Sequence, residues 1–276
     1  MSEKPEANTP RFLAWLYSTP AQQPVLAALC ALEREIGASL RPGIDHHVAH
    51  TRLAWWREEC GRCATGNPVH PLTRELRTHL ERLAPEARAN TMLAGLSGLV
   101  DAAGWDLAAA TFERRKELTA YCRRWAAAMI TPFAVAAGER SELGAALREI
   151  ELLCDLARDA RSGRLRLPLD ELEQARVAPE ALATPPWPEA LAAILRQRHE
   201  ALRGKLAAAV AGVAPESQTR LRGLLVWSAL SWQLSLRAQR ALPHAASTAS
   251  AAAANWRAWR AARAAARGRL ELSESK

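Results

Sequence analysis

Apolar residues recur at helical spacing along most of this chain, and this periodicity constrains the fold more than any other feature. Within residues 24–40, Val25, Leu29, Leu32 and Ile36 follow one another at steps of three and four. That spacing places side chains on one face of an α-helix. No run of β-branched or aromatic residues alternates with polar residues over five positions or more, as a half-buried strand requires. We therefore predict a single-domain, all-α bundle of eight to ten helices.

Prolines and glycines divide the rest of the chain into helix-length pieces. Further helices are expected at about residues 44–63, 71–83, 85–100, 112–137, 141–161, 189–212 and 215–241, and the one at 112–137 is expected to be interrupted near Pro132. Four prolines within residues 179–188 exclude a helix there. We expect three parts: a disordered N-terminus (1–10), a helical domain (11–242) and an Ala/Arg-rich C-terminal helix or tail (243–276).

Positive charge is spread along the chain rather than gathered in one block. Lys and Arg number 37 against 29 Asp and Glu, a net charge of +8. Because no basic block stands out, we expect no nucleic-acid partner, whereas phosphates and anionic membranes stay compatible with the charge. Near the C-terminus, Arg260, Arg263 and Arg267 share a helical face beside Trp256 and Trp259. This indicates either membrane or partner contact, or a solvated helix that packs its tryptophans on the bundle.

Hydropathy and cysteine usage favour a cytoplasmic location. The longest apolar stretch, at about residues 126–138, is shorter than the ~20 residues of a membrane-spanning helix. The first ten residues are polar and contain prolines, unlike a secretory signal. The five cysteines are scattered and odd in number, which is typical of reduced core thiols. We expect a cytoplasmic protein, with membrane association as an open alternative.

Three carboxylates form a ladder in the middle of the chain. Glu151, Asp155 and Asp159 stand at i, i+4 and i+8, on one helical face. Such a ladder repels itself unless cations lie against it, and Mg²⁺ with a substrate phosphate would supply them. A solvated face offset by neighbouring arginines is the other interpretation, and spacing alone leaves both open.

The segment around this ladder resembles a known family. Asp155-x-x-x-Asp159-Ala-Arg-x-Gly-Arg-x-x-Leu-Pro168 is similar to the second aspartate motif of squalene and phytoene synthases. Further blocks agree in order: Leu29-Cys-Ala-Leu-x-Arg34-Glu35-Ile36, Arg52-Leu-x-Trp-Trp56-Arg57, Gly66-x-Pro-x-His70-Pro71-Leu, Gly104-Trp-Asp106-Leu and Leu118-x-x-Tyr121-Cys122-x-x-x-Ala126. These blocks lie within roughly residues 12–172. The resemblance implies an isoprenoid-synthase-like bundle with a central cavity, in which Mg²⁺ helps to join two prenyl diphosphates.

The resemblance also implies roles for single residues. It assigns a metal site to Asp155 and Asp159, diphosphate binding to Arg34, Arg52 and Arg57, and a place in the reaction cavity to Tyr121. For each arginine a structural ion pair is the alternative, and for the tyrosine a core position with a bonded hydroxyl. The implied ligand is a prenyl diphosphate or a related lipid-like molecule.

The chain departs from the family where the first aspartate motif should stand. Residues 37–41 read Gly-Ala-Ser-Leu-Arg and hold no carboxylate. We expect head-to-head condensation to be impaired or lost, although ligand binding persists. We further expect a cationic face of Arg34, Ala38 and Arg41 opposite the aspartates, with no carboxylate of that helix closer than Glu35.

The alternative is a non-catalytic scaffold. It resembles the branch of this fold that includes a mitochondrial complex I assembly factor, which keeps the helices while the aspartate motifs decay.

A Cys-x-x-Cys pair offers a second candidate metal site. Cys60 and Cys63 follow His46, His47 and His50 on one predicted helix. A zinc site needs four converging ligands, and no second Cys-x-x-Cys exists in the chain. We interpret these cysteines as packing residues.

Overall fold

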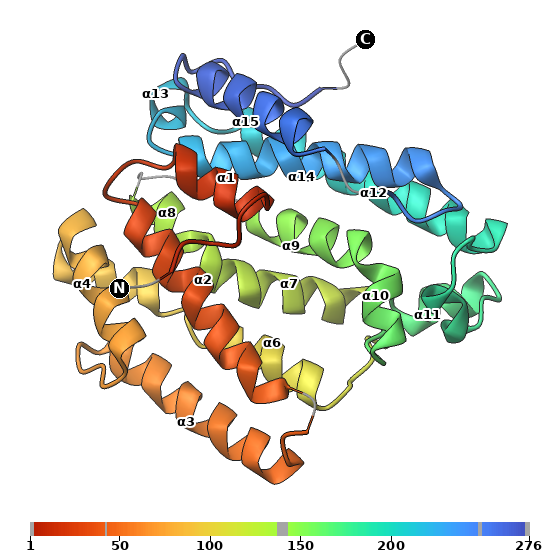
Figure 1. Cartoon of the computed structure of the whole chain (residues 1–276), viewed down its shortest axis with the longest axis horizontal. Coiled ribbons are helices and arrows are strands. Elements are labelled where there is room, and N and C mark those ends of the chain that lie inside the picture. The colour runs from red at the N-terminus through yellow and green to blue at the C-terminus, as the bar shows by residue number, and fades with distance from the viewer. Residues whose placement is uncertain (1–2, 42, 137–142, 248–249, 274–276) are drawn as a thin grey trace.

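The computed structural model describes residues 3–41, 43–136, 143–247 and 250–273. Within these ranges the chain is all-α, without a strand (Figure 1). The α-helices are α1 (Pro10–Tyr17), α2 (Gln23–Gly37), α3 (His46–Ala64), α4 (Pro71–Leu83), α5 (Glu86–Leu93), α6 (Gly98–Leu107), α7 (Arg115–Met129), α8 (Thr131–Ala136), α9 (Leu143–Cys154), α10 (Leu156–Arg161), α11 (Leu169–Gln174), α12 (Glu189–Ala211), α13 (Pro215–Gln218), α14 (Arg222–Ala241) and α15 (Ala251–Ala265). Two 3₁₀ helices, Ala38–Leu40 and Pro179–Ala183, complete the secondary structure of the described residues.

The all-α prediction is confirmed, but the predicted number of eight to ten helices is too low. Four expected helices are divided. The one at 85–100 divides into α5 and α6, and the one at 112–137 divides into α7 and α8 just before Pro132, whose ring removes a backbone donor. The one at 141–161 divides at Asp155, whose ψ of 5° leaves the helical range. The one at 215–241 divides into α13 and α14.

Helix α14 organises one half of the bundle. It packs against α1, α9, α12 and α15, while α7 packs against α2, α6, α8 and α9. Figure 1 shows α1, α14 and α15 together at the top of the view, with α3 at the bottom. Trp125 of α7 and Trp227 of α14 are fully buried and meet edge to face, with ring centroids 6.0 Å apart. Helices from distant parts of the sequence therefore share one core.

A glycine allows α1 to lie directly on α14. A Cβ atom on Gly223 would stand 2.0 Å from Ser18 Oγ and 2.5 Å from Ala14 O, closer than nonbonded atoms can approach. The side-chain oxygen of Thr9 accepts a hydrogen bond from Phe12 N at 3.1 Å and so caps α1. This seating brings Arg11, at the start of α1, into the bundle.

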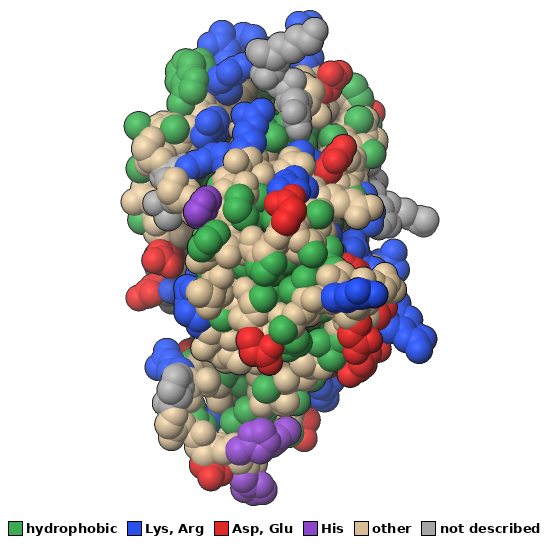
Figure 2. All heavy atoms as spheres, turned by 90° about the vertical axis from the view of Figure 1, so that its right-hand side faces the viewer, with side chains coloured by type: hydrophobic (Ala, Val, Ile, Leu, Met, Phe, Trp, Pro, Cys, Tyr) green, Lys and Arg blue, Asp and Glu red, His purple; other side chains and the backbone are tan. Residues whose placement is uncertain are grey.

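Helix α15 forms the outer layer above α14. It buries Ala258, Ala261, Ala262 and Ala265, the alanine face that the composition of the C-terminal part suggests. Figure 2 shows Lys and Arg side chains near the top of the molecule, the level at which α15 lies in Figure 1. Among the described residues, no helix has both the length and the apolar character needed to cross a membrane.

Candidate functional site

A cavity of about 600 Å³ opens among α1, α2, α9, α10 and α14. Its volume is in the usual range of ligand pockets, ~300–1,000 Å³. Its wall contains seven arginines and five carboxylates: Arg11, Arg34, Arg148, Arg158, Arg164, Arg166 and Arg237, with Glu6, Asp106, Glu151, Asp155 and Asp159. The charged residues of the cavity wall therefore carry an excess of positive charge.

Both aspartates of the second motif line this cavity, and both have arginine partners. Asp155 precedes α10 and forms an ion pair with Arg158 at 2.5 Å. Asp159, one turn later, accepts a hydrogen bond from Arg166 Nε at 2.9 Å. The side chain of Asp155 is 41% exposed and that of Asp159 is 12% exposed. The two residues face the cavity, but their charges are already neutralised by protein cations.

Arg166 connects two of the sequence blocks that carry the family resemblance. Its Nη1 donates to Asp106 of α6 at 2.8 Å, and its Nε donates to Asp159. Burial disfavours the charged form, but the hydrogen bond to Asp106 and nearby charges outweigh it and raise the pKa of Arg166 well above its ordinary value. Arg166 therefore remains a cation at all physiological pH values. It occupies the place before Leu-Pro where the family carries a tyrosine.

These residues do not fit a magnesium site. Mg²⁺ needs ionised carboxylates with free lone pairs in near-octahedral geometry, whereas Arg158 pairs with Oδ2 of Asp155 and Arg166 with Oδ2 of Asp159. Burial, followed by the charge of Asp159, raises the pKa of Asp155, although Arg158 acts in the opposite direction. Within the described residues, no three His, Cys, Asp or Glu side chains form a group that could hold a metal ion.

A half-buried ion network lies at the inner wall of the cavity. Arg11 of α1 pairs with Glu33 of α2 and, through Nη2 at 2.9 Å, with Glu151 of α9. Glu151 also pairs with Arg148 at 3.1 Å. Glu33 accepts a further hydrogen bond from Trp125 Nε1 at 2.7 Å. Four helices thus meet in one set of charge-assisted bonds, which are shorter and stronger than neutral ones.

Arg11 also covers the two core tryptophans. Its guanidinium lies 5.3 Å from the ring centroids of both Trp125 and Trp227, within cation–π range. Burial disfavours the charged form of Glu33, but Arg11, Arg148 and the bond from Trp125 outweigh it and lower the pKa of Glu33. The inner wall is therefore permanently charged.

Helix α2 does not line the cavity with all of the residues that the sequence predicts. It contributes Cys30 and Arg34 to the wall, but Ala38 and Arg41 do not line it. Glu35 is exposed, and Glu33 pairs with Arg11; neither carboxylate of α2 lines the cavity. The prediction that α2 brings no carboxylate closer to the aspartates than Glu35 stays a prediction.

Tyr121 lies behind the cavity wall rather than on it. The residue is buried, and its hydroxyl accepts a hydrogen bond from Arg148 Nη2 at 3.4 Å. The guanidinium carbons of Arg148 and Arg166 lie 5.9 and 5.6 Å from its ring centroid. The structure therefore gives Tyr121 the geometry of a residue that supports two cavity arginines.

Two of the three candidate diphosphate-binding arginines lie away from the cavity. Arg52 and Arg57 are exposed on α3, and Arg57 pairs with Asp101 of α6 at 2.7 Å. Helix α3 turns Leu53 and Trp56 toward the core, so the neighbouring positions point outward. Arg34 alone among the three lines the cavity.

The Cys-x-x-Cys segment is a packing element. Cys60 and Cys63 are buried, and burial raises the pKa of each thiol to about 12. His46 and His50 lie at the exposed start of α3, where their Nε2 atoms are 3.0 Å apart. The four side chains therefore do not converge.

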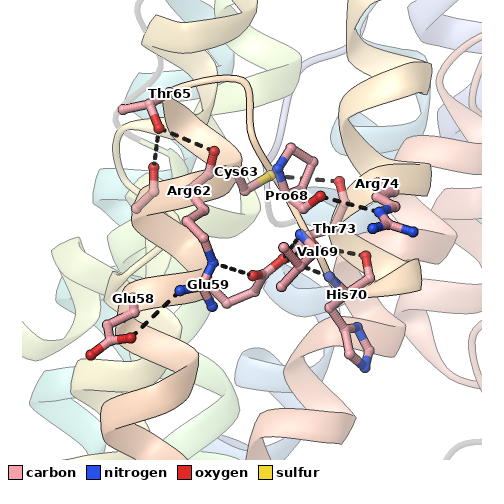
Figure 3. Close-up of polar contacts among 11 residues, drawn as sticks. Glu58, Glu59, Arg62, Cys63, Thr65, Pro68, Val69, His70, Thr73 and Arg74 are labelled. Atoms are coloured by element: carbon pink, nitrogen blue, oxygen red, sulfur yellow. Dashed lines mark hydrogen bonds and ion pairs between the residues drawn. The ribbon is translucent and has the colours of Figure 1, made fainter.

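A buried carboxylate beside these cysteines ties α3 to α4 (Figure 3). Glu59 Oε1 accepts hydrogen bonds from the backbone N–H groups of Val69 and His70, both at 2.9 Å, and from the Thr73 hydroxyl. Arg62 Nε donates to its other oxygen at 2.8 Å. Burial opposes ionisation, but the bond from Thr73 and these other bonds outweigh it and lower the pKa of Glu59.

Sequence reasoning named Arg148 only as one of the arginines that offset the carboxylate ladder, and it missed Arg11 on the cavity wall and its partner Glu33. Arg11 and its partner Glu151 are 140 positions apart, and no local pattern links them. The one available signal was the unusual placement of Arg11 among apolar residues at the start of a helix.

The fold and this cavity define an all-α protein of the isoprenoid-synthase type. The family model of squalene/phytoene synthase matches residues 5–265, well beyond the motifs at 12–172. The chain therefore belongs to the squalene/phytoene synthase family. None of the curated proteins compared with the chain matches it.

Solved structures support the same fold at low sequence identity. One is a dehydrosqualene synthase in complex with ligand, with a TM-score of 0.65, 15% identity, and coverage of 92% of this chain and 89% of that chain. Another is squalene synthase HpnC from Alicyclobacillus acidocaldarius, with a TM-score of 0.63, 17% identity, and coverage of 83% and 87%.

Proposed function

We propose that this chain binds an anionic lipid-like ligand, such as a prenyl diphosphate, through cavity arginines and without Mg²⁺, and that it has lost head-to-head condensation. The observation that carries the proposal is the pairing of both motif aspartates with arginines, Asp155 with Arg158 and Asp159 with Arg166. Ionisation of a diphosphate needs strong electrostatic help from metal ions in this family's reaction.

Three cavity arginines remain available for an anion. Arg164 and Arg237 have no carboxylate partner among the described residues, and Arg34 is 3.7 Å from the exposed Glu3. Guanidinium groups bind phosphate oxygens in a bidentate manner. An anion can therefore be held by protein cations alone, with the paired aspartates left in place.

Incubation of the pure protein with farnesyl diphosphate and Mg²⁺ tests the loss of condensation. We expect no release of pyrophosphate above the uncatalysed background. Turnover at ~1 s⁻¹ or faster, as in ordinary enzymes, would contradict the proposal.

A non-catalytic scaffold is the second candidate function. The absence of carboxylates from residues 37–41 favours it as much as it favours metal-free binding. The two candidates differ in the use of the cavity, because a pure scaffold needs no ligand. If neither pyrophosphate nor farnesyl diphosphate binds in a calorimetric titration, the scaffold function replaces the first proposal.

We also propose that α15 makes peripheral contact with an anionic membrane. Trp256 and Trp259 are 59% and 40% exposed, and their rings stack with centroids 4.9 Å apart. Arg260 and Arg263 lie on the same helix, which contains no acidic residue. Exposed tryptophans beside arginines suit the interface of an anionic bilayer.

Sedimentation with lipid vesicles tests this contact. We expect binding to vesicles with phosphatidylserine, weak binding to pure phosphatidylcholine, and loss of binding in the Trp256→Ala/Trp259→Ala double variant. Equal binding of wild type and double variant to phosphatidylserine vesicles would contradict the proposal.

A further inference from the structure

A second, apolar groove lies beside the arginine-rich cavity. It has a volume of about 250 Å³ and lies between α1, α14 and α15. Its apolar wall consists of Pro10, Leu13, Leu230, Leu234, Ala251 and Ala254. We call it the α15 groove.

The charged residues of the α15 groove are of one sign. Arg237 and Arg257 line it, and no carboxylate of the described chain does. An apolar channel with cations alone at its edges complements a hydrocarbon chain that carries an anionic head.

The α15 groove adjoins the cavity. Pro10, Leu234 and Arg237 belong to the walls of both, so the two spaces share part of their boundary. Arg237 donates a hydrogen bond from Nη2 to the backbone oxygen of Ser247 at 2.9 Å, and this bond holds it at the junction. A ligand can therefore place its head against the cavity arginines and its tail in the groove.

A hydrocarbon tail is not expected to extend from the cavity toward the core of the bundle, on the side away from the α15 groove. There the cavity ends at Arg11, Arg148 and Glu151, and Arg11 covers Trp125 and Trp227. A tail pressed against this network would remove the remaining hydration of buried charges, and contact with hydrocarbon offers them no compensating bonds. The α15 groove adjoins the cavity at a different place, and no carboxylate of the described residues lines it.

We infer that the α15 groove binds the single hydrocarbon chain of an anionic amphiphile whose phosphate head lies in the arginine-rich cavity. This inference rests on the proposed function, because it takes the head-binding arginines as given. The hydrocarbon chain of the ligand would then leave the bundle beside α15 and would not enter the core.

Two probes separate the contributions of head and tail. Calorimetric titration with inorganic pyrophosphate measures the head alone, and titration with farnesyl diphosphate measures head and tail. We expect wild type to bind farnesyl diphosphate about tenfold more tightly or better, since several methylene groups become buried.

Ala251→Trp fills the groove from its exposed rim, and Ala252→Trp is the matched control at an exposed neighbour outside the groove. We expect Ala251→Trp to weaken farnesyl diphosphate binding about tenfold, to leave pyrophosphate binding unchanged, and the control to change neither. Ala254→Leu, at a second groove position, gives a milder blocking variant if Ala251→Trp fails to fold.

The outcomes separate the inference from the proposed function. Intact pyrophosphate binding with equal farnesyl diphosphate affinity in the blocking and control variants overturns the inference alone. Failure of wild type to bind pyrophosphate overturns the proposed function, and the inference with it.

Discussion

Arg11 is the residue on which the character of the cavity most depends. It neutralises Glu33 and Glu151, and it separates two buried tryptophans from the cavity. Removing one member of a buried ion network leaves its partners uncompensated, which costs more than the network contributes as a whole. A cavity with this wall selects against apolar ligands at its inner end.

Arg11→Met should lower the free energy of unfolding by about 3 kcal/mol, as expected for an orphaned buried charge. Adding Glu33→Gln should restore part of this loss, because glutamine still accepts the bond from Trp125 without a charge. Urea unfolding of the two single variants and the double variant measures the coupling. Strictly additive effects would mean that the two residues do not interact.

Substitution of Arg164 tests whether a single cavity arginine contributes to anion binding. Arg164→Gln should weaken pyrophosphate binding about tenfold, since a charge-assisted bond to phosphate is lost. Arg52→Gln is the matched control, because Arg52 is exposed on α3 outside the cavity wall. Equal affinity of these two variants would remove Arg164 from the binding site.

The connection between α3 and α4 depends on one buried carboxylate. Glu59 receives bonds from α3, from α4 and from the loop between them. Its folded-state pKa is lower than the ordinary value of 4.5, so its ionised form stabilises the fold. This contribution is complete above pH 4.5 and disappears as the pH falls through the lower folded-state pKa.

Glu59→Gln should therefore destabilise the protein at pH 7 by about 1–3 kcal/mol, and by less at pH 3. Unfolding by urea at both pH values measures this difference. A loss of the same size at both pH values would show that the charge of Glu59 contributes nothing.

The close packing of α1 on α14 is a second contact between helices that a substitution can test. Gly223→Ala should lower stability by about 1–3 kcal/mol, because the new methyl group collides with Ser18 and Ala14. Thermal unfolding measures the loss, and Gly204→Ala, at a helical glycine with open space around it, is the control. A Gly223→Ala protein as stable as wild type would mean that α1 can shift without cost.

At the scale of the whole molecule, the sequence predicts the all-α fold class, but it does not predict the ion pairs that form the cavity wall. Apolar spacing predicts the helices because local geometry determines it, and the second aspartate motif placed Asp155 and Asp159 on the cavity wall. The missed features are long-range: Arg11 meets Glu151, and Arg166 meets Asp106, across 140 and 60 positions. Pro132 itself predicts the helix break before it, whereas the break at Asp155 has no comparable local signal and raises the number of helices above the predicted eight to ten.

Short-range arginine pairs at both motif aspartates are the basis of our proposal that this chain works without magnesium. Arginines occupy the positions around both motif aspartates, and the opposing helix offers no carboxylate at residues 37–41. The chain keeps the bundle of its family, and its cavity wall contains more arginines than carboxylates. The proposed function follows from this excess: protein cations would bind an anion in the cavity.

The most direct test is a calorimetric titration of wild-type protein with farnesyl diphosphate, once in excess EDTA and once in excess Mg²⁺. Binding by arginines alone predicts dissociation constants that agree within about threefold. Binding that appears only with Mg²⁺, and that Asp159→Asn abolishes, would contradict the account.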